Sequence, residues 1–353
     1  MSASKEYYGG WAGSGTTSWA RGGNAREWRD VGPGVRRCPV CGSPSWCQVR
    51  GDGAVVLCKR VASDREKENA DGVTYYVHWL SGAPPRTEAW ERRLDPSRAR
   101  ADVETLDTAF AAVLRELRLS AEDRAHLRAR GLSDATIDAE RFRSLGIEGR
   151  ARVARAVEEA VGDDVARIPG IVQKTEGARA WWSLSGSPGI VIPCRDTEGR
   201  VVALKVRRRE AGEGPRYLYL TSSRAGGASA LSALHVPLAA RDRLHRALVI
   251  TEGELKACVA QEIMGGGFAV VSLPGVGAWR AAVELVAEAN PRRAVVAFDM
   301  DRFTNPVVAR ACRDLVNELR ARWNHERVEL WSWDRAHKGI DDYLASKRKG
   351  AAA

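Results

Sequence analysis

The chain has 353 residues, 44% of them hydrophobic, so it can bury the cores of two or three domains and is not a short peptide that depends on cross-links. Its 55 Lys and Arg outnumber its 45 Asp and Glu, and the net charge of +10 makes a nucleic acid the first partner to consider, although an Arg-rich proteome would give the same excess. No apolar run is long enough to cross a membrane and the start lacks a signal-peptide pattern, so we expect a cytoplasmic protein with no membrane partner.

Residues 1–35 are rich in Gly, Ser, Trp and Arg and follow neither a helical nor a strand period, which predicts a flexible arm. Aromatic side chains interleaved with arginine can stack on unpaired bases, but an uncommitted tail is the simpler interpretation.

Four of the seven cysteines fall within 21 residues: Cys38, Cys41, Cys47 and Cys58. In a reducing compartment this clustering favours a metal over disulfides, and four thiolates satisfy one tetrahedral zinc ion. We therefore predict a zinc-binding module over residues 36–82, with a strand near its end at 73–80. His78 is the substitute ligand if one cysteine stays free.

The next two segments carry no sign of chemistry. Residues 83–102 are rich in Pro and Arg, which is typical of a linker. From residue 103 to about 161 the apolar spacing is helical, and Ser120 and Ser133 have the character of helix N-caps. We assign a helical segment to residues 103–180.

A basic β-rich subdomain is predicted over residues 181–245. Strands at 190–194 and 200–206 flank a turn at 196–199, and residues 217–220 offer a third strand. Between Arg195 and Arg224 the chain has eight Lys or Arg and four acids, which suits contact with phosphates, although a solvated face of a hairpin explains any single arginine as well.

From residue 246 to 353 strands alternate with helices, which predicts a parallel sheet covered by helices on both faces. The strands are expected at 247–251, 268–273, 293–298 and 327–331. Helices are expected at 254–264, 278–289 and 306–322, followed by a last turn at 341–344.

Carboxylates follow the strands of this predicted sheet. Glu252 ends the first strand, and Asp299 and Asp301 end the third, where an extended segment would point both to the same side. The carboxyl ends of parallel strands form the ligand crevice of such sheets, so these acids should converge. Asp341 and Asp342 follow the fourth strand, where a helix cap or a solvated loop is as good an explanation as a metal. Acids without His or Cys select Mg²⁺ or Mn²⁺ over zinc.

The glycine-rich stretches do not form a nucleotide-binding fingerprint. The sequence has no phosphate loop of the Gly-x-x-x-x-Gly-Lys-Ser/Thr type, so the chain is not itself an ATP-driven helicase. Residues 265–267 and 274–277 do not fit the dinucleotide pattern either, and ordinary turns explain them.

A carboxylate and glycine after the first strand, and Asp-x-Asp after a later one, resemble the TOPRIM domain of primases, topoisomerases and several nucleases. The cysteine cluster resembles the zinc ribbon of DnaG-type bacterial and phage DNA primases, and the closest likeness is to small stand-alone primase-like proteins of phages and plasmids, that is, of mobile genetic elements. Further segments similar to those primases are Ile192–Asp196, Gly199–Val202, Pro215–Leu218 and Lys338–Leu344.

The resemblance implies an α/β fold: a TOPRIM doubly wound parallel sheet preceded by a small basic β-rich subdomain, a helical segment and a zinc ribbon. It implies synthesis of short primers on single-stranded DNA from nucleoside triphosphates. Asp299 and Asp301, with Asp341 or Asp342, would hold Mg²⁺ or Mn²⁺, and Glu252 would complete the metal site or act as general base. The groups that would hold template or triphosphate are Arg195, Lys205, Arg207, Arg208, Arg216 and Tyr217.

Three features depart from the primase pattern. Val61 stands where a second Cys-x-x-Cys would end, so either Cys47 supplies the fourth zinc ligand or the zinc is held differently. Lys256 stands four residues after Glu252, where an acid is common, which bears on metal loading. The sequence ends nine residues after Leu344 without a helicase-binding domain, so a replicative helicase would be contacted in trans through another surface.

Two other functions are compatible with the same residues. A TOPRIM nuclease would use the metals to activate water against a phosphodiester, and would shorten oligonucleotides instead of lengthening them. A non-catalytic replication or defence module would only bind single-stranded DNA, and its binding would survive the loss of every acid.

Overall fold

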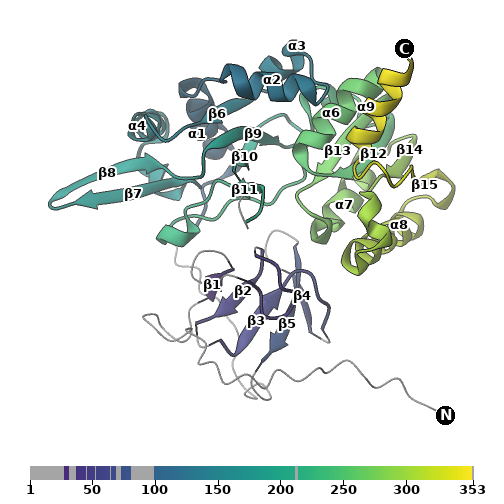
Figure 1. The fold of residues 1–353 in the computed structure, drawn as a ribbon, viewed down its shortest axis with the longest axis horizontal. Helices are drawn as coiled ribbons and strands as arrows, with labels where there is room; N and C mark the ends of the chain where they lie inside the picture. The colour runs from purple at the N-terminus through teal and green to yellow at the C-terminus, as the bar shows by residue number, and fades with distance from the viewer. Residues whose placement is uncertain are drawn as a thin grey trace.

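The computed structural model describes residues 28–31, 37–44, 46–51, 53–63, 65–68, 73–80, 99–210 and 214–351. Figure 1 shows three parts: an N-terminal sheet, a central antiparallel sheet with its helices, and a C-terminal parallel sheet. Most of the arm predicted for 1–35 and of the linker predicted for 83–102 lies outside the described residues. None of the helices in the described ranges is long and apolar enough to span a membrane.

The N-terminal module is one antiparallel sheet of five short strands in the order β1-β2-β3-β5-β4. Its strands are β1 (Trp28–Asp30), β2 (Gln48–Arg50), β3 (Val55–Cys58), β4 (Glu66–Glu68) and β5 (Thr74–Trp79). The strand predicted at 73–80 is confirmed as β5. β1 lies inside the stretch predicted as arm, because three half-buried residues are too few to show a strand period.

The helical segment contains α1 (Val103–Glu116), α2 (Ala121–Ala129), α3 (Asp134–Ala139) and α4 (Arg150–Val161), with the 3-10 turn η2 (Gly162–Arg167) after α4. Ser120 and Ser133 are N-caps, as predicted: each hydroxyl accepts a hydrogen bond from a backbone N–H in the first turn. The prediction was wrong after η2, where β7 (Ile171–Glu176) and β8 (Arg179–Leu184) form a hairpin that projects from the molecule (Figure 1). Its outer residues are exposed on both faces, so no alternation of apolar residues marks them.

The central sheet is antiparallel with the order β11-β10-β9-β6, formed by β6 (Arg143–Leu145), β9 (Gly189–Arg195), β10 (Val201–Arg208) and β11 (Tyr217–Tyr219). The predicted hairpin and third strand are therefore confirmed. Helices cover both faces: Leu204 packs with α1 and α4, whereas Ile192 packs with residues of α2, α3 and α6. All seven residues of β9 are buried.

The C-terminal sheet is parallel with the order β13-β12-β14-β15, which confirms the doubly wound fold. Its elements, after the short α5 (Leu238–Arg241), are β12 (Ala247–Glu252), α6 (Glu254–Met264), β13 (Phe268–Leu273), α7 (Arg280–Ala289), β14 (Arg293–Val296), α8 (Pro306–Arg322), β15 (Val328–Leu330) and α9 (Ile340–Ala351). Val249 packs toward α6 and α9, and its neighbour Ile250 packs toward α7 and α8. The predicted last turn is the start of α9.

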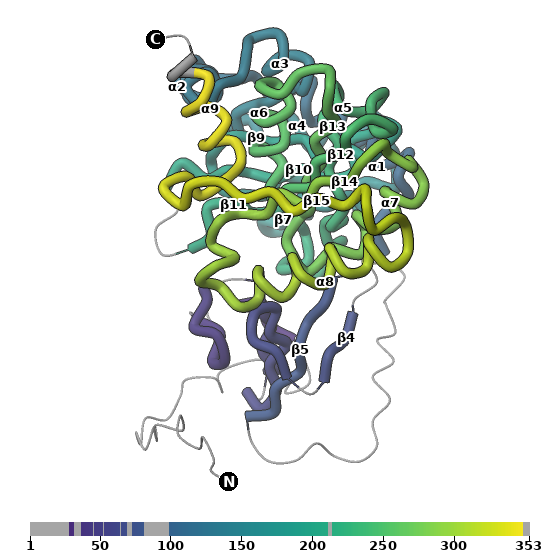
Figure 2. The backbone as a smooth tube through the Cα atoms, turned by 90° about the vertical axis from the view of Figure 1, so that its right-hand side faces the viewer, coloured from purple at the N-terminus to yellow at the C-terminus, as the bar shows by residue number. Residues whose placement is uncertain are grey.

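The N-terminal module lies against α7 and α8 of the parallel sheet, as Figures 1 and 2 both show. Arg280 of α7 pairs with Glu68 at 2.9 Å and donates to Thr74 Oγ1 at 3.0 Å. Arg310 of α8 pairs with Glu66 at 3.2 Å and lies over the ring of Tyr76.

Candidate metal centres and the acidic edge

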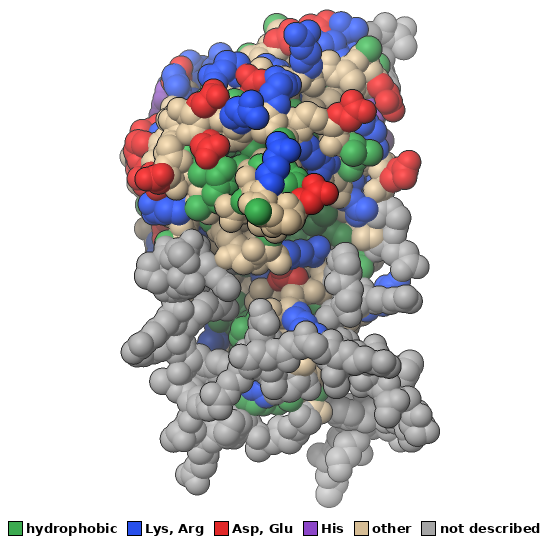
Figure 3. All heavy atoms as spheres, turned by 90° about the vertical axis from the view of Figure 1, so that its left-hand side faces the viewer, with side chains coloured by type: hydrophobic (Ala, Val, Ile, Leu, Met, Phe, Trp, Pro, Cys, Tyr) green, Lys and Arg blue, Asp and Glu red, His purple; other side chains and the backbone are tan. Residues whose placement is uncertain are grey.

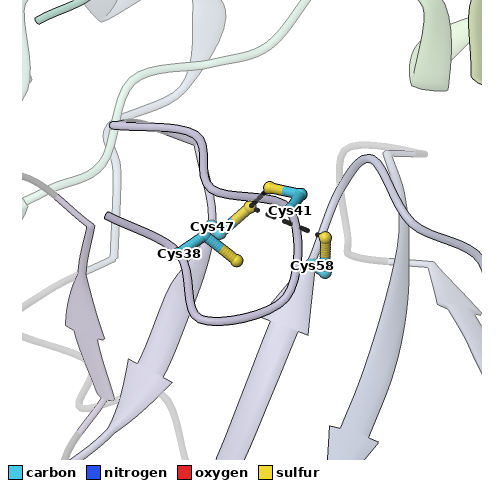
Figure 4. A group of neighbouring side chains, drawn as sticks. All are labelled: Cys38, Cys41, Cys47 and Cys58. Atoms are coloured by element: carbon cyan, nitrogen blue, oxygen red, sulfur yellow. Dashed lines mark hydrogen bonds between the residues drawn. The ribbon is translucent and has the colours of Figure 1, made fainter. Parts of the chain in front are cut away.

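The four clustered cysteines converge in the N-terminal module. Their sulfur atoms all lie within 4.8 Å of one another, and in Figure 4 they point toward a common centre from the loops and from the end of β3. Cys47 is the fourth member, and His78 is not: its Nε2 lies 2.9 Å from the carbonyl oxygen of Val61. The set fits one zinc ion, because four thiolates at this spacing give the closed tetrahedral shell of a structural site.

Hydrogen-bond donors surround two of the four sulfurs. The backbone N–H groups of Arg60 and Val61 donate to Cys58 Sγ at 3.4 and 3.3 Å, and the Arg60 guanidinium donates to Cys47 Sγ at 3.8 Å. Hydrogen bonds from Cys47 and Cys58 lower the pKa of Cys38 far below its usual range, and the same contacts raise the pKa of Cys47 and of Cys58, so without a metal one of these three sulfurs carries the charge. Donors to sulfur stabilise the charge that a metal-bound cysteine carries.

We expect the purified chain to carry one zinc ion, and Cys47→Ser to lose it. Loss of the metal removes folding energy from the N-terminal sheet, so the variant should also unfold more readily there. His78→Ala is the matched control and should keep its zinc. Metal analysis by mass spectrometry checks both variants, and full zinc content in Cys47→Ser would contradict the four-cysteine assignment.

We use the name acidic edge for the carboxylates of Glu252, Asp299, Asp301 and Asp341, which lie near the ends of β12 and β14. Glu252 is the last residue of β12, and its Oε1 accepts a hydrogen bond from the backbone N–H of Asp299 at 3.2 Å. Asp301 lies in the 3-10 turn η6 (Met300–Phe303). The prediction of an extended segment from Asp299 to Asp301 was therefore wrong. The two Asp side chains still share one neighbour: Lys338 Nζ lies 3.0 Å from Asp301 Oδ2 and 3.9 Å from Asp299 Oδ2.

Lys256, in the first turn of α6, lies among these acids. Its Nζ donates to both carboxylate oxygens of Asp299, at 2.6 and 2.5 Å. Burial lowers the pKa of Lys256, but Asp299 raises it by more, so the ammonium is retained. Burial, and then the charge of Asp299, raise the pKa of Glu252 to about 7. Glu252 can therefore take up or release a proton near neutral pH.

The two neighbouring acids Asp341 and Asp342 lie in different environments. Asp341 is buried and pairs with Arg130 from the end of α2, whereas Asp342 is exposed. Arg130 was missed by the sequence analysis, because an Arg-Gly pair at the end of a helix looks like an ordinary C-terminus. Only the fold brings it to a carboxylate 211 residues away.

The donors at the acidic edge fit a hard cation in type, since they are carboxylates without His or Cys. Two buried oxygens, Asp301 Oδ1 and Asp341 Oδ1, have no hydrogen-bond partner. In the described ranges, however, only the cysteines bring three or more metal-binding atoms within 4.8 Å of one another. The carboxylates are instead spread around the Lys256 ammonium.

Two of the basic residues assigned to nucleic-acid contact are buried in ion pairs. Lys205 Nζ lies 2.6 Å from Glu254 Oε1, with side chains that are 4% and 2% exposed. Arg195 Nε lies 3.2 Å from Glu140 Oε2, and both residues are buried. Neither reaches the surface of the chain.

The other basic residues lie on the adjoining strands. Arg207 and Arg208 of β10 are half-buried, Arg216 is exposed, and half-buried Tyr217 of β11 is the register partner of Arg207. Burial lowers the pKa of His126 on α2, and the charges of Arg207, Arg130 and Arg216 lower it further. The charges of three arginines therefore act on this imidazole, against the opposite effect of Asp123, and one of the three, Arg130, pairs with Asp341.

The face around α4 and the β7–β8 hairpin differs from this arginine group. In Figure 3, Lys and Arg side chains on the described part of that face are interspersed with Asp and Glu. Mixed charges give a weak net field for a polyanion, so the arginine group at β10, β11 and α2 is the better candidate for phosphate contact.

Comparisons with known proteins were made for sequence and for fold. A domain of unknown function, DUF3854, matches residues 240–351 by its family model, and a search of the curated proteins finds no match. The fold is similar to that of the zinc-binding and RNA polymerase domains of Aquifex aeolicus primase, with 12% identity and a TM-score of 0.53 over 88% of this chain and 74% of that one.

Two further solved structures are similar over the central and C-terminal parts. The DnaG primase catalytic domain bound to ssDNA has 16% identity and a TM-score of 0.50, covering 70% of this chain and 76% of that one. The E. coli primase catalytic core has 15% identity and a TM-score of 0.50, covering 70% and 79%. At such identities the likeness establishes the fold alone: an N-terminal sheet with the cysteine cluster, a central antiparallel sheet and a parallel sheet, similar to these primase structures.

Proposed function

We propose that the chain is a DNA-primase-like nucleotidyltransferase that makes short primers on single-stranded DNA. The observation that carries the proposal is that Arg130 pairs with Asp341 of the acidic edge, while its charge, together with those of Arg207 and Arg216, acts on His126 of α2. A polymerase needs this combination, because the same phosphates must be bound by cations and presented to the reacting groups. The primase-type fold supports the assignment.

At the acidic edge, Glu252, Asp301 and Asp341 are the residues that would hold magnesium, with Asp299 next to them. The cation would supply charge neutralisation at the triphosphate and activation of the attacking 3′-hydroxyl. Glu252 would complete the metal site or, if it stays off the cation, accept the proton of that hydroxyl, for which its raised pKa of about 7 is suited. Lys338 is largely exposed beside Asp301 and can meet an incoming triphosphate.

On the strands, Arg207, Arg208 and Arg216 would hold template phosphates, and Tyr217 offers a ring for base stacking. The solved structure of a DnaG catalytic domain bound to ssDNA supports a single-stranded template as the partner. Arg195 and Lys205 would act indirectly, by holding β9 and β10 against Glu140 and Glu254. Nucleoside triphosphates are the second substrate, and a helicase in trans remains part of the proposal.

A primer-synthesis assay tests the function. Single-stranded templates of mixed sequence are incubated with magnesium or manganese and with either ribonucleotides or deoxyribonucleotides, and the labelled products are sized. We expect lengthened oligonucleotides that require triphosphates. Shortened DNA in the absence of triphosphates would instead identify a nuclease, and metal-independent binding without any product would identify a binding module.

The arginines on β10 and β11 should set the salt dependence of DNA binding. Replacing Arg207 and Arg216 together by Ala is expected to flatten the log–log salt dependence of single-strand affinity by about 1.4 units, at roughly 0.7 per phosphate contact. Arg152→Ala, at an exposed position on α4, is the control and should leave the slope unchanged. Fluorescence anisotropy over a salt series measures the slopes. An unchanged slope in the double variant would move the phosphate contacts to another surface.

A further inference from the structure

Lys256 is held in place by three separate segments of the chain. It projects from the first turn of α6, and its ammonium lies 2.6 and 2.5 Å from the two oxygens of Asp299, after β14. Its stem passes Gly339, in the loop before α9, where an added Cβ would come within 3.3 Å of Lys256 Cδ and Cε and 2.4 Å of Asp341 Oδ1. The Lys256 side chain is 24% exposed and that of Asp299 is 5% exposed.

This position is the centre of the acidic edge. Glu252 ends β12 four residues before Lys256, Asp299 binds its ammonium, and Asp341 lies against the same glycine that lets the stem pass. Sites that transfer phosphoryl groups often hold two divalent cations roughly 3.5–4 Å apart between such carboxylates. Here one positive charge is already supplied by the chain.

We propose that the Lys256 ammonium takes the place of one of two divalent cations, so that the acidic edge binds a single magnesium ion. This inference deepens the proposed function and rests on it. An ammonium neutralises one carboxylate and can donate to a phosphate oxygen, but it has no open coordination position with which to activate a hydroxyl. The remaining cation must do that, and the unpartnered oxygens Asp301 Oδ1 and Asp341 Oδ1 are available for it.

The two lysines at this edge are not equivalent. Lys338 has a side chain that is 64% exposed, and its Nζ lies 3.0 Å from Asp301 Oδ2 and 3.9 Å from Asp299 Oδ2. An exposed ammonium swings away at little cost and is screened by solvent, so it does not occupy a cation position. Lys338→Met therefore serves as the matched control for Lys256→Met.

The test counts Mn²⁺ ions bound by the zinc-loaded full chain without nucleotide or DNA, by electron paramagnetic resonance. We expect wild type and Lys338→Met to saturate at about one Mn²⁺ per chain in the acidic edge. Lys256→Met and Lys256→Asp should each saturate at about two, since Asp299 is left without a cation and the second variant adds a carboxylate. Met keeps the length of the stem, and thermal unfolding verifies that each variant is folded.

Two outcomes would overturn the inference: two Mn²⁺ ions in the wild type, or one Mn²⁺ in a folded Lys256→Met variant. Failure of the proposed function is separate and visible in the primer-synthesis assay. If the chain binds one Mn²⁺ but makes no primer, the inference about Lys256 stands and the proposed polymerase function is refuted. If the chain makes primers and binds two Mn²⁺ ions, the proposed polymerase function stands and the inference about Lys256 is refuted.

Discussion

Asp301→Asn is expected to reduce nucleotide incorporation on the order of a hundredfold or more, while the sheet stays folded. The substitution keeps the size of the side chain but removes the charge that a hard cation needs. Asp301 Oδ1 is buried without a hydrogen-bond partner, and the other oxygen of the carboxylate pairs only with Lys338, whose side chain is 64% exposed. Single-stranded DNA affinity should hold or rise slightly, because a negative charge near phosphate is lost.

Asp342→Asn is the matched control for this experiment. Asp342 is one residue from Asp341 in the sequence, but it is exposed at the start of α9 and lies outside the acidic edge. Its substitution should leave incorporation near the wild-type rate. Labelled-nucleotide incorporation and DNA binding are measured for both variants with magnesium and with manganese. Wild-type incorporation by Asp301→Asn would refute the assigned catalytic edge.

Lys205→Met should lower the free energy of unfolding by about 3–5 kcal/mol, because it leaves Glu254 buried without its cation. The pair is deep: the two side chains are 4% and 2% exposed, and Tyr219 also donates to Glu254 at 3.4 Å. Adding Glu254→Gln to Lys205→Met removes the unpaired charge and should recover much of the loss. Denaturant unfolding of the wild type and of these two variants measures the difference.

The two roles considered for Lys205 make opposite predictions. If Lys205 contacted phosphate, Lys205→Met would weaken DNA binding and change its salt slope while stability stayed near that of wild type. If Lys205 is instead buried in its ion pair with Glu254, Lys205→Met lowers the free energy of unfolding, and the salt slope of DNA binding by the folded protein is unchanged. A fully stable Lys205→Met variant would contradict the burial of this pair.

The parallel sheet could be predicted from the sequence because its strands are short continuous apolar runs. Residues such as Val249 and Ile250 are buried on opposite faces, and each such run ends at a carboxylate or a turn. The same reasoning placed Glu252 and Asp299 at the carboxyl edge and selected Cys47 as the fourth zinc ligand. These results depend on local patterns that the fold does not override.

The remaining features depend on contacts between distant segments. Lys205 and Arg195 look like surface residues in an alternating strand, and only the packing of α6 and α3 beside the central sheet supplies Glu254 and Glu140 as partners. Lys256 was recognised as a departure, but its contact with Asp299 requires β12 and β14 to be neighbours. The β7–β8 hairpin has too little buried surface to leave a hydrophobic pattern.

Ion pairs between exposed side chains help to hold the N-terminal module against α7 and α8. The ion pairs that join Arg280 and Arg310 to Glu66 and Glu68 involve side chains that are 39–44% exposed. Exposed pairs of this kind contribute about 0–1 kcal/mol each and weaken as salt rises. The module also has its own core around Cys47, Val49 and Val56, so its fold does not rest on these pairs. We therefore expect rising ionic strength to weaken the attachment of the N-terminal module to α7 and α8.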